Sequence, residues 1–271
     1  MRRMKYFQGK TVWLTGASGG IGAALATAFA RDGANLILSG RNTDKIEALG
    51  STLAGTFPGE YKTLFLDLAH TDDHVETARK ARSLFGSVDV LVNNAGISQR
   101  SLLHETSYEV IEQLMRVNFL GSAALTIEML KDMYERRTGH IVALSSIMGL
   151  FSTPLRSGYC AAKHAVQGFY ESLSHEASHY GVGVTIIVPG WIRTDIAVNA
   201  LEGDGTRHAI VDPGQAAARG PEAYAEEMVN AIARRKFYHY TALNWKTRAA
   251  LLLNRFVPRL LRSAMRRLDV T

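Results

Sequence analysis

Three side chains in this 271-residue sequence have the types and spacing that proton transfer requires: Ser146, Tyr159 and Lys163. Tyr159 and Lys163 stand four positions apart in a run with helical periodicity, so both project from one face of the predicted helix. A free phenol, with a pKa near ~10, is a weak acid or base at neutral pH, and lowering it by about three units requires roughly 4 kcal/mol of preferential phenolate stabilisation. A fixed ammonium supplies much of that. The spacing therefore predicts an acid/base Tyr159 whose pKa Lys163 lowers, with Ser146 holding a carbonyl or alcohol oxygen.

The same residues also have a simpler interpretation. Tyr159 and Lys163 alone form an ordinary pair on an amphipathic helix, and Ser146 alone is a loop hydroxyl. The elements that would position them decide between the two interpretations.

A glycine turn follows the first predicted strand, Thr11–Thr15, and precedes a helix that runs to about Asp32. Its spacing is Gly16-x-x-x-Gly20-x-Gly22, which lets the backbone approach a pyrophosphate at a helix N-terminus. The turn also matches Gly-x-Ser-x-Gly, with Ser18 as the nucleophile of a hydrolase elbow. The downstream histidines that a hydrolase would need stand in no recognisable motif.

Arg41 follows the second predicted strand, Asn35–Ser39, where NAD-binding folds usually place a carboxylate on the adenosine ribose. A guanidinium pairs with a 2′-phosphate instead, so we predict NADP(H) as the cofactor. A solvated arginine at a helix start is the alternative. Asp67, at the end of the predicted strand 61–68, would stand beside the adenine or simply cap a helix.

Strands alternate with helices along the rest of the chain. Further buried strands are predicted over 88–92, 141–144 and 184–188, and a long helical region over 108–136 carries Asn118 within an apolar face. This order predicts an α/β fold: a single-domain, Rossmann-type, doubly wound parallel sheet with helices on both faces and ligands at the carboxyl ends of its strands. We place the catalytic domain at 1–243 and a basic amphipathic helical extension at 244–271.

Composition narrows the class of protein. Hydrophobic residues make up 46% of the chain, enough for a large core. The one cysteine, Cys160, excludes an internal disulfide and a cysteine metal cluster, and we expect no bound metal. The first ten residues hold no long apolar run, so we expect neither a secretory signal nor a membrane span there, and we expect a cytoplasmic protein.

The motifs occur together and in order: the glycine turn, Asn93-Asn94-Ala95-Gly96, Asn118, Ser146, Tyr159-x-x-x-Lys163 and Pro189-Gly190-x-x-x-Thr194. In this the chain resembles the short-chain dehydrogenases/reductases over about residues 9 to 240. The resemblance implies an NADP-dependent enzyme acting on CH–OH donors, working as a homodimer or homotetramer. A catalytically silent NADPH-binding sensor or scaffold is the alternative function.

The resemblance also assigns roles. Tyr159 would be the acid/base, Lys163 would bind the nicotinamide ribose, Ser146 would polarise the substrate oxygen, and Asn118 would hold a water in a proton relay. Ser145 competes with Ser146, but the thirteen-residue interval to the tyrosine favours Ser146. The implied cofactor contacts are Gly16, Ser18, Gly20, Ile21, Gly22, Arg41, Asp67, Leu68, Asn94, Gly96, Tyr159, Lys163, Pro189, Gly190, Ile192 and Thr194.

Two segments are similar to the member 7B branch of this family, which includes animal enzymes linked to acyl- or alkyl-dihydroxyacetone phosphate reduction. They are 154–159 and 199–206. The irregular stretch from 195 to 220 follows a cofactor-contacting strand, and we predict that it forms a lid. Four apolar residues flank the catalytic positions and predict an apolar or lipid-like ketone or alcohol, although core packing explains them equally well: Leu150, Phe151, Leu155 and Trp191.

The tail concentrates positive charge. Between Met228 and Leu268 there are ten Lys/Arg and no Asp/Glu, which leaves 21 basic against 25 acidic residues elsewhere. Apolar residues interleave with the cations from Asn244 onward, and Pro258 should divide two short helices. Such a segment either lies on the inner membrane surface, packs on the body, or meets a subunit partner. We expect no nucleic-acid binding, because no aromatic platform or reading motif accompanies the charge.

Overall fold

Seven short runs of residues, five of them mostly buried, pair as parallel strands in the computed structural model, which describes residues 6–70, 73–210 and 213–267. The order across the sheet is β3-β2-β1-β4-β5-β6-β7, so the direction of winding reverses between β1 and β4. The strands are β1 (Thr11–Thr15), β2 (Asn35–Gly40), β3 (Tyr61–Phe65), β4 (Val90–Asn93), β5 (Gly139–Leu144), β6 (Val182–Pro189) and β7 (Tyr238–Thr241). The predicted Rossmann-type fold is confirmed.

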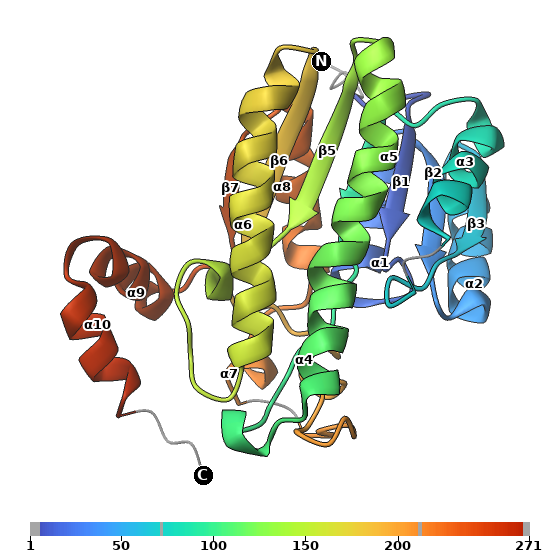
Figure 1. The fold of residues 1–271 in the computed structure, drawn as a ribbon. Helices are drawn as coiled ribbons and strands as arrows, with labels where there is room; N and C mark the ends of the chain where they lie inside the picture. The colour runs from blue at the N-terminus through green and yellow to red at the C-terminus, as the bar shows by residue number, and fades with distance from the viewer. Residues whose placement is uncertain (1–5, 71–72, 211–212, 268–271) are drawn as a thin grey trace.

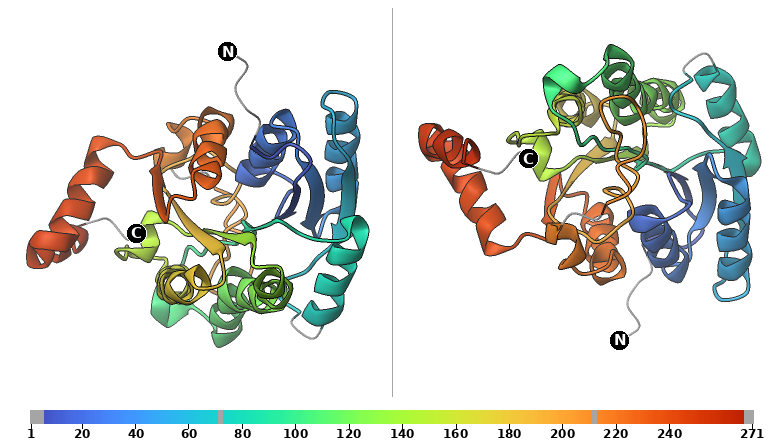
Figure 2. Two further views of the ribbon diagram at one scale, coloured as in Figure 1. Left: turned by 90° about the horizontal axis from the view of Figure 1, so that it is seen from above. Right: turned by 90° about the horizontal axis from the view of Figure 1, so that it is seen from below.

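Helices cover both faces of the sheet (Figures 1 and 2). They are α1 (Gly20–Arg31), α2 (Thr43–Ala54), α3 (His74–Phe85), α4 (Tyr108–Met115), α5 (Gly121–Glu135), α6 (Ser157–Ser178), α7 (Pro213–Ala216), α8 (Glu222–Ala233), α9 (Trp245–Phe256) and α10 (Pro258–Met265). Short 3₁₀ turns occur at Leu103–Glu105 and Ile147–Gly149.

Alternation along the strands divides the core into two layers, because successive side chains of a strand point to opposite faces. Trp13 of β1 belongs to the layer under α3, α4, α5 and α6, whereas Val12 and Leu14 belong to the layer under α1, α2 and α8. The two layers lie on opposite faces of the sheet and together bury its central strands.

The observed elements refine the predicted ones. The single helix predicted over 108–136 is interrupted by a π-helical turn at Arg116–Leu120, and α8 and β7 were not predicted. The tail forms two short helices, and Pro258 begins the second, as predicted. Within the predicted lid, 195–220, only α7 is helical among the described residues, and residues 211 and 212 lie outside them.

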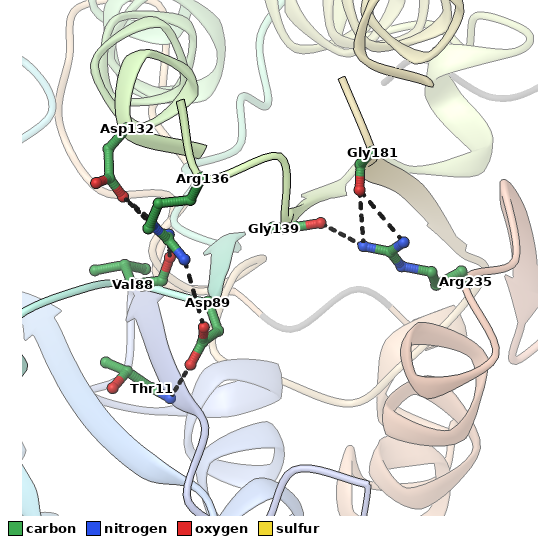
Figure 3. A network of polar contacts seen from close by, with 8 residues as sticks. All are labelled: Thr11, Val88, Asp89, Asp132, Arg136, Gly139, Gly181 and Arg235. Atoms are coloured by element: carbon green, nitrogen blue, oxygen red, sulfur yellow. Dashed lines mark hydrogen bonds and ion pairs between the residues drawn. The ribbon is translucent and has the colours of Figure 1, made fainter. Parts of the chain in front are cut away.

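Polar contacts tie the amino ends of the central strands together, away from the strand ends that carry the motifs (Figure 3). Asp89 accepts a hydrogen bond from the Thr11 backbone N–H at 2.9 Å and lies 3.8 Å from the Arg136 guanidinium. Arg235 donates to the carbonyls of Gly139 at 2.6 Å and Gly181 at 3.5 Å. These contacts hold the sheet together at the amino ends of its strands.

His140 of β5 is buried among these strands, and its Nε2 lies 2.8 Å from Thr185 Oγ1. Burial, reinforced by the positive charges of Arg235 and Lys10, lowers the pKa of His140 to about 3. The folded protein therefore keeps this imidazole neutral down to acidic pH.

His140 should make the fold sensitive to acid. Between pH 6.5 and 3 the unfolded chain binds a proton that the folded chain excludes, so stability falls as pH falls, by about 2–3 kcal/mol between pH 7.5 and 4.5. His140→Gln, which keeps an amide for Thr185 but does not titrate, should lose less of its stability over that interval in urea unfolding. The matched control is His175→Gln at an exposed position of α6. Equal acid losses in wild type and His140→Gln would contradict this assignment.

Candidate active site

The carboxyl ends of the strands border one cleft with a volume of about 570 Å³. It extends from the glycine turn after β1 to the residues after β5 and β6. Every predicted cofactor residue lines it, as do Ser146 and Trp191; of the four predicted catalytic residues, only Asn118 does not.

The glycine turn leaves no room for a side chain at Gly16 and Gly22. Gly16 and Gly20 have positive φ values, of 68° and 54°. A Cβ on Gly22 would lie 2.0 Å from the Gly16 carbonyl oxygen and 2.7 Å from Asn94 Nδ2. The turn is thus a cradle of bare backbone at the N-terminus of α1, which suits a pyrophosphate.

Asn94 and Thr15 hold that cradle against β4. Asn94 Nδ2 donates to the carbonyls of Thr15 at 2.9 Å and Gly16 at 3.1 Å. Thr15 Oγ1 accepts from the backbone N–H groups of Asn94 at 3.0 Å and Ala95 at 3.1 Å. The two adjacent amides therefore differ: Asn94 supports the turn, whereas Asn93 points away from it and donates to Thr126 Oγ1 and Tyr170 OH.

Cations gather where β2 ends. Arg41, Asn42 and Lys45 line the cleft there, and the Asn42 side chain caps α2 by accepting from the Lys45 N–H at 2.9 Å. Asp67 lies across the cleft after β3, where its carboxylate also accepts from the Ala69 N–H at 3.0 Å. This end of the cleft carries two positive side chains beside one carboxylate.

Asn118 is held by the backbone of Ile97, which lies in the loop after β4. The π-helical turn places it inward, where Nδ2 donates to the Ile97 carbonyl and Oδ1 accepts from the Ile97 N–H, both at 3.0 Å. A Cβ on Gly96 would lie 2.7 Å from Asn118 Oδ1 and 3.7 Å from Lys163 Nζ. Asn118 thus lies just behind the lysine end of the cleft and secures the loop after β4.

The proton-transfer residues come together as their spacing predicts. Tyr159 and Lys163 lie on one buried face of α6, and Lys163 Nζ is 5.8 Å from the Tyr159 ring centroid. Lys163 Nζ donates to the Leu144 carbonyl at 2.8 Å. The Ser146 hydroxyl lies close enough to Tyr159 to lower the pKa of the phenol and also accepts from the Met148 N–H at 3.2 Å, whereas the Ser145 hydroxyl donates to the Lys163 carbonyl at 3.5 Å. This contrast favours Ser146 over Ser145 as the partner of Tyr159.

The electrostatics of Tyr159 differ from the prediction. Burial raises the pKa of Tyr159, and its hydrogen bond with Ser146 and the charge of Arg156 offset this only in part. Burial also lowers the pKa of Lys163 to about 8. The net lowering of the Tyr159 pKa that we predicted is not found, because desolvation of the phenol outweighs its attraction to Lys163, whose ammonium donates to the Leu144 carbonyl. Tyr159 is therefore a protonated phenol at neutral pH.

A buried amide that sequence reasoning missed fixes the start of α6. Gln99 Oε1 accepts from the Gly158 N–H at 2.8 Å, and its Nε2 donates to Ser101 and Thr106 hydroxyls at 3.1 Å each. The Gly158 N–H belongs to the first turn of a helix, where backbone donors lack intrahelical partners. Gln99 thereby orients the turn that carries Tyr159.

Only some of the predicted substrate residues line the cleft. Trp191 and Ser146 line the cleft, whereas Leu150, Phe151 and Leu155 do not. Phe151 is buried in the core, and the Leu150 carbonyl accepts from Asn254 Nδ2 of α9 at 2.8 Å. These three residues occupy packing and connecting positions, as the alternative interpretation held.

Other residues line the substrate end of the cleft, none of which sequence reasoning selected: Ile97, Gln113, Val117, Met148, Arg156, Ile196, Asn199, Leu201 and Arg207. Several belong to the 195–220 segment, which is tied down by backbone contacts. Leu201 pairs with Gln99 and with Arg207, and Ser107 N–H donates to the Gly203 carbonyl at 2.8 Å. The segment thus contributes to the wall of the cleft, and its closure as a lid stays a prediction.

A family model described as short chain dehydrogenase matches residues 10–205. The chain belongs to the short-chain dehydrogenase family. Within this family, it is 39% identical over 239 residues to mouse (Mus musculus) dehydrogenase/reductase SDR family member 7B, an alignment that covers 87% of this chain and 74% of the relative. The predicted resemblance to member 7B is confirmed, and family membership argues against a hydrolase with Ser18 as nucleophile.

Solved structures of the short-chain dehydrogenase family share the fold. A protein of Burkholderia phymatum in complex with NAD is 27% identical with a TM-score of 0.81, and the match covers 94% of this chain and 96% of that one. One of Sphingobium yanoikuyae in complex with NADPH is 25% identical with a TM-score of 0.78, and the match covers 96% of each chain.

The glycine turn offers a matched pair of substitutions. Gly22→Ala should weaken NADPH binding at least ~tenfold, equivalent to ~1.4 kcal/mol, because the new methyl group collides with the Gly16 carbonyl. Gly19→Ala in the same turn should change it little, because a Cβ there meets nothing within 4 Å. Fluorescence titration of both folded variants with NADPH measures the difference. Similar losses in the two variants would show that the backbone cradle does not set affinity.

Proposed function

We propose that this chain is an NADP(H)-dependent oxidoreductase that interconverts a carbonyl and a secondary alcohol on an apolar or lipid-like substrate. The observation that carries the proposal is the buried hydroxyl of Tyr159, hydrogen-bonded to Ser146 and close to Lys163, in the same cleft as the glycine cradle. One end of the cleft suits a dinucleotide, and the other suits proton exchange with a bound oxygen.

A bound nicotinamide supplies or accepts hydride at the substrate carbon. The chain's residues handle the proton. In reduction, the Tyr159 O–H donates to the developing alkoxide while the Ser146 hydroxyl holds that oxygen in place. The Lys163 ammonium, 5.8 Å from the phenol ring, stabilises the phenolate that remains. Because Tyr159 holds its proton at neutral pH, it has a proton to donate in the direction of reduction.

The preference for NADP(H) rests on Arg41 with Lys45. Both line the cleft where β2 ends, where a 2′-phosphate of the adenosine would lie. The related structures were solved with NAD in one case and NADPH in another, so the cations of this chain carry the assignment.

The lining of the substrate end supports an amphiphilic substrate. Ile97, Val117 and Met148 offer apolar surface near Ser146, while Arg156 and Arg207 add positive charge to the same cleft. A carbonyl compound with an apolar chain and an anionic group matches both features.

Tyr159→Phe tests the reaction. In NADPH oxidation against apolar and lipid-like ketones, including an acyl-dihydroxyacetone phosphate, the variant should lose about 10²- to 10⁴-fold in turnover, the usual contribution of a positioned acid. NADPH affinity should stay close to that of wild type. The control is Tyr134→Phe. Tyr134 is a half-buried residue of α5 whose ring stacks on that of Tyr180.

Unchanged turnover in Tyr159→Phe would contradict the acid role. Tight NADPH binding by wild type without turnover of any ketone would favour the silent sensor.

Arg41→Ala tests the cofactor. Losing charge-assisted hydrogen bonds to a 2′-phosphate should weaken NADPH binding by about 10- to 100-fold and leave NADH binding nearly unchanged. Arg79→Ala, an exposed arginine paired with Glu76 on α3, controls for net charge. Calorimetric titration with both cofactors gives the ratio, and an equal effect on NADPH and NADH would rule out the assignment.

A further inference from the structure

The C-terminal arm, which we define as α9 and α10, is attached to the body through one face only. Thr247 and Leu261 are buried, and Asn254 Nδ2 donates to the Leu150 carbonyl at 2.8 Å. Leu251 and Met265 pack against the core layer under α6. Figures 1 and 2 show the arm projecting beside β7, apart from the layered body.

The outer face of α9 is apolar. Trp245, Leu252 and Phe256 are 75%, 60% and 69% exposed. They stand at positions i, i+7 and i+11, which lie within a narrow stripe along one side of a helix. The exposed Val257 and Leu260 extend this surface into α10. A helix packed on a water-soluble body normally turns polar residues outward, so this apolar stripe requires a partner.

Positive charge borders the stripe. On α9, Arg248 and Arg255 follow Trp245 by three and ten positions, which places both on one flank of the stripe. On α10, the exposed residues include Arg259, Arg262 and Arg266. The sequence has no Asp or Glu between Met228 and Leu268.

We propose that the C-terminal arm docks on the surface of an anionic phospholipid bilayer. Trp245, Leu252 and Phe256 would enter the boundary between headgroups and acyl chains, while the flanking arginines pair with lipid phosphates. The arm would lie in the plane of the surface. No helix of the described residues is long and apolar enough to cross a membrane, and α9 has 12 residues.

Charge distinguishes this partner from a second copy of the chain. A two-fold contact would bring the same patch against itself, so that arginines face arginines without acidic residues to compensate. A nucleic acid is a poorer partner for this surface, because it offers bases for stacking and phosphates but no hydrocarbon layer. The exposed apolar residues here are mostly aliphatic and adjacent: Leu252, Phe256, Val257 and Leu260.

Vesicle binding by the full chain tests the proposal. Wild type should co-sediment with vesicles made from equal parts of phosphatidylcholine and phosphatidylglycerol, and much less with phosphatidylcholine alone. Arg255→Gln/Arg259→Gln/Arg262→Gln should lower the apparent affinity by up to ~100-fold, since each cation near an anionic surface contributes roughly a factor of five. Leu252→Ser/Phe256→Ser should lower it at least ~tenfold.

Matched controls change the same residue types on the body. Val75→Ser/Ile127→Ser removes two exposed apolar residues from α3 and α5, and Arg31→Gln/Arg79→Gln/Arg116→Gln removes three positive charges from α1, α3 and the π-helical turn. Both controls should bind anionic vesicles more tightly than the arm variants do. Retained NADPH binding in the arm variants shows that they are folded.

Trp245 reports insertion directly, because Trp13 is fully buried and Trp191 lies partly buried in the cleft. Anionic vesicles should shift tryptophan emission to shorter wavelengths in wild type and not in Trp245→Phe.

Three results would overturn the proposal: no binding of wild type to anionic vesicles, arm variants that bind as wild type does, or a stripe variant that only lowers the oligomeric state. The last would assign the stripe to contact between copies. None of these results depends on turnover. Membrane docking can therefore fail while the proposed oxidoreductase function stands, and docking can hold while the proposed function fails.

Discussion

The junction between β1 and β4 is the contact on which the rest of the site depends. Winding reverses there, so no helix crosses over that point and a crevice stays open. The fully buried Thr15 hydroxyl closes the junction: it accepts from the Asn94 and Ala95 N–H groups and donates to the Val92 carbonyl at 3.2 Å. One hydroxyl at the end of β1 thus bonds three backbone groups at the end of β4 and in the residues that follow it.

Fixing that junction fixes both ends of the cleft at once. On one side Asn94 spans the glycine turn, and on the other Gly96 brings the backbone close to Asn118 and Lys163. The α6 helix approaches equally closely, because a Cβ on Gly149 would lie 2.6 Å from the Lys163 carbonyl oxygen. This proximity buries Tyr159 and Lys163 together, and burial disfavours charge on each. A neutral phenol and a readily deprotonated ammonium follow from packing.

The sequence was sufficient where function depends on local spacing. Tyr159 and Lys163 are neighbours because helices repeat every 3.6 residues, and buried apolar runs marked most strands. It was insufficient where contacts join distant segments. Gln99 and Gly158 are 59 residues apart, and Leu201 meets Gln99 across an even longer interval, so neither partner is visible from spacing. Leu150, Phe151 and Leu155 misled because closeness in sequence to Ser146 says nothing about which side of a turn a residue faces. The pKa of Tyr159 was misjudged because attraction to a cation was counted and desolvation was not.

The arm shows the same limit in a different form. Its periodicity predicted two amphipathic helices, and the structure has them, but α9 carries apolar residues on two sides and only the fold decides which side remains open. Leu251 packs against the core of the body, whereas the adjacent Leu252 is exposed. A second cleft, of about 570 Å³, lies at the root of the arm and includes Arg248 of α9; Trp191 lines both this cleft and the catalytic one. If the arm docks on a bilayer as proposed, an amphiphilic substrate held there would meet the protein beside a residue that also lines the catalytic cleft.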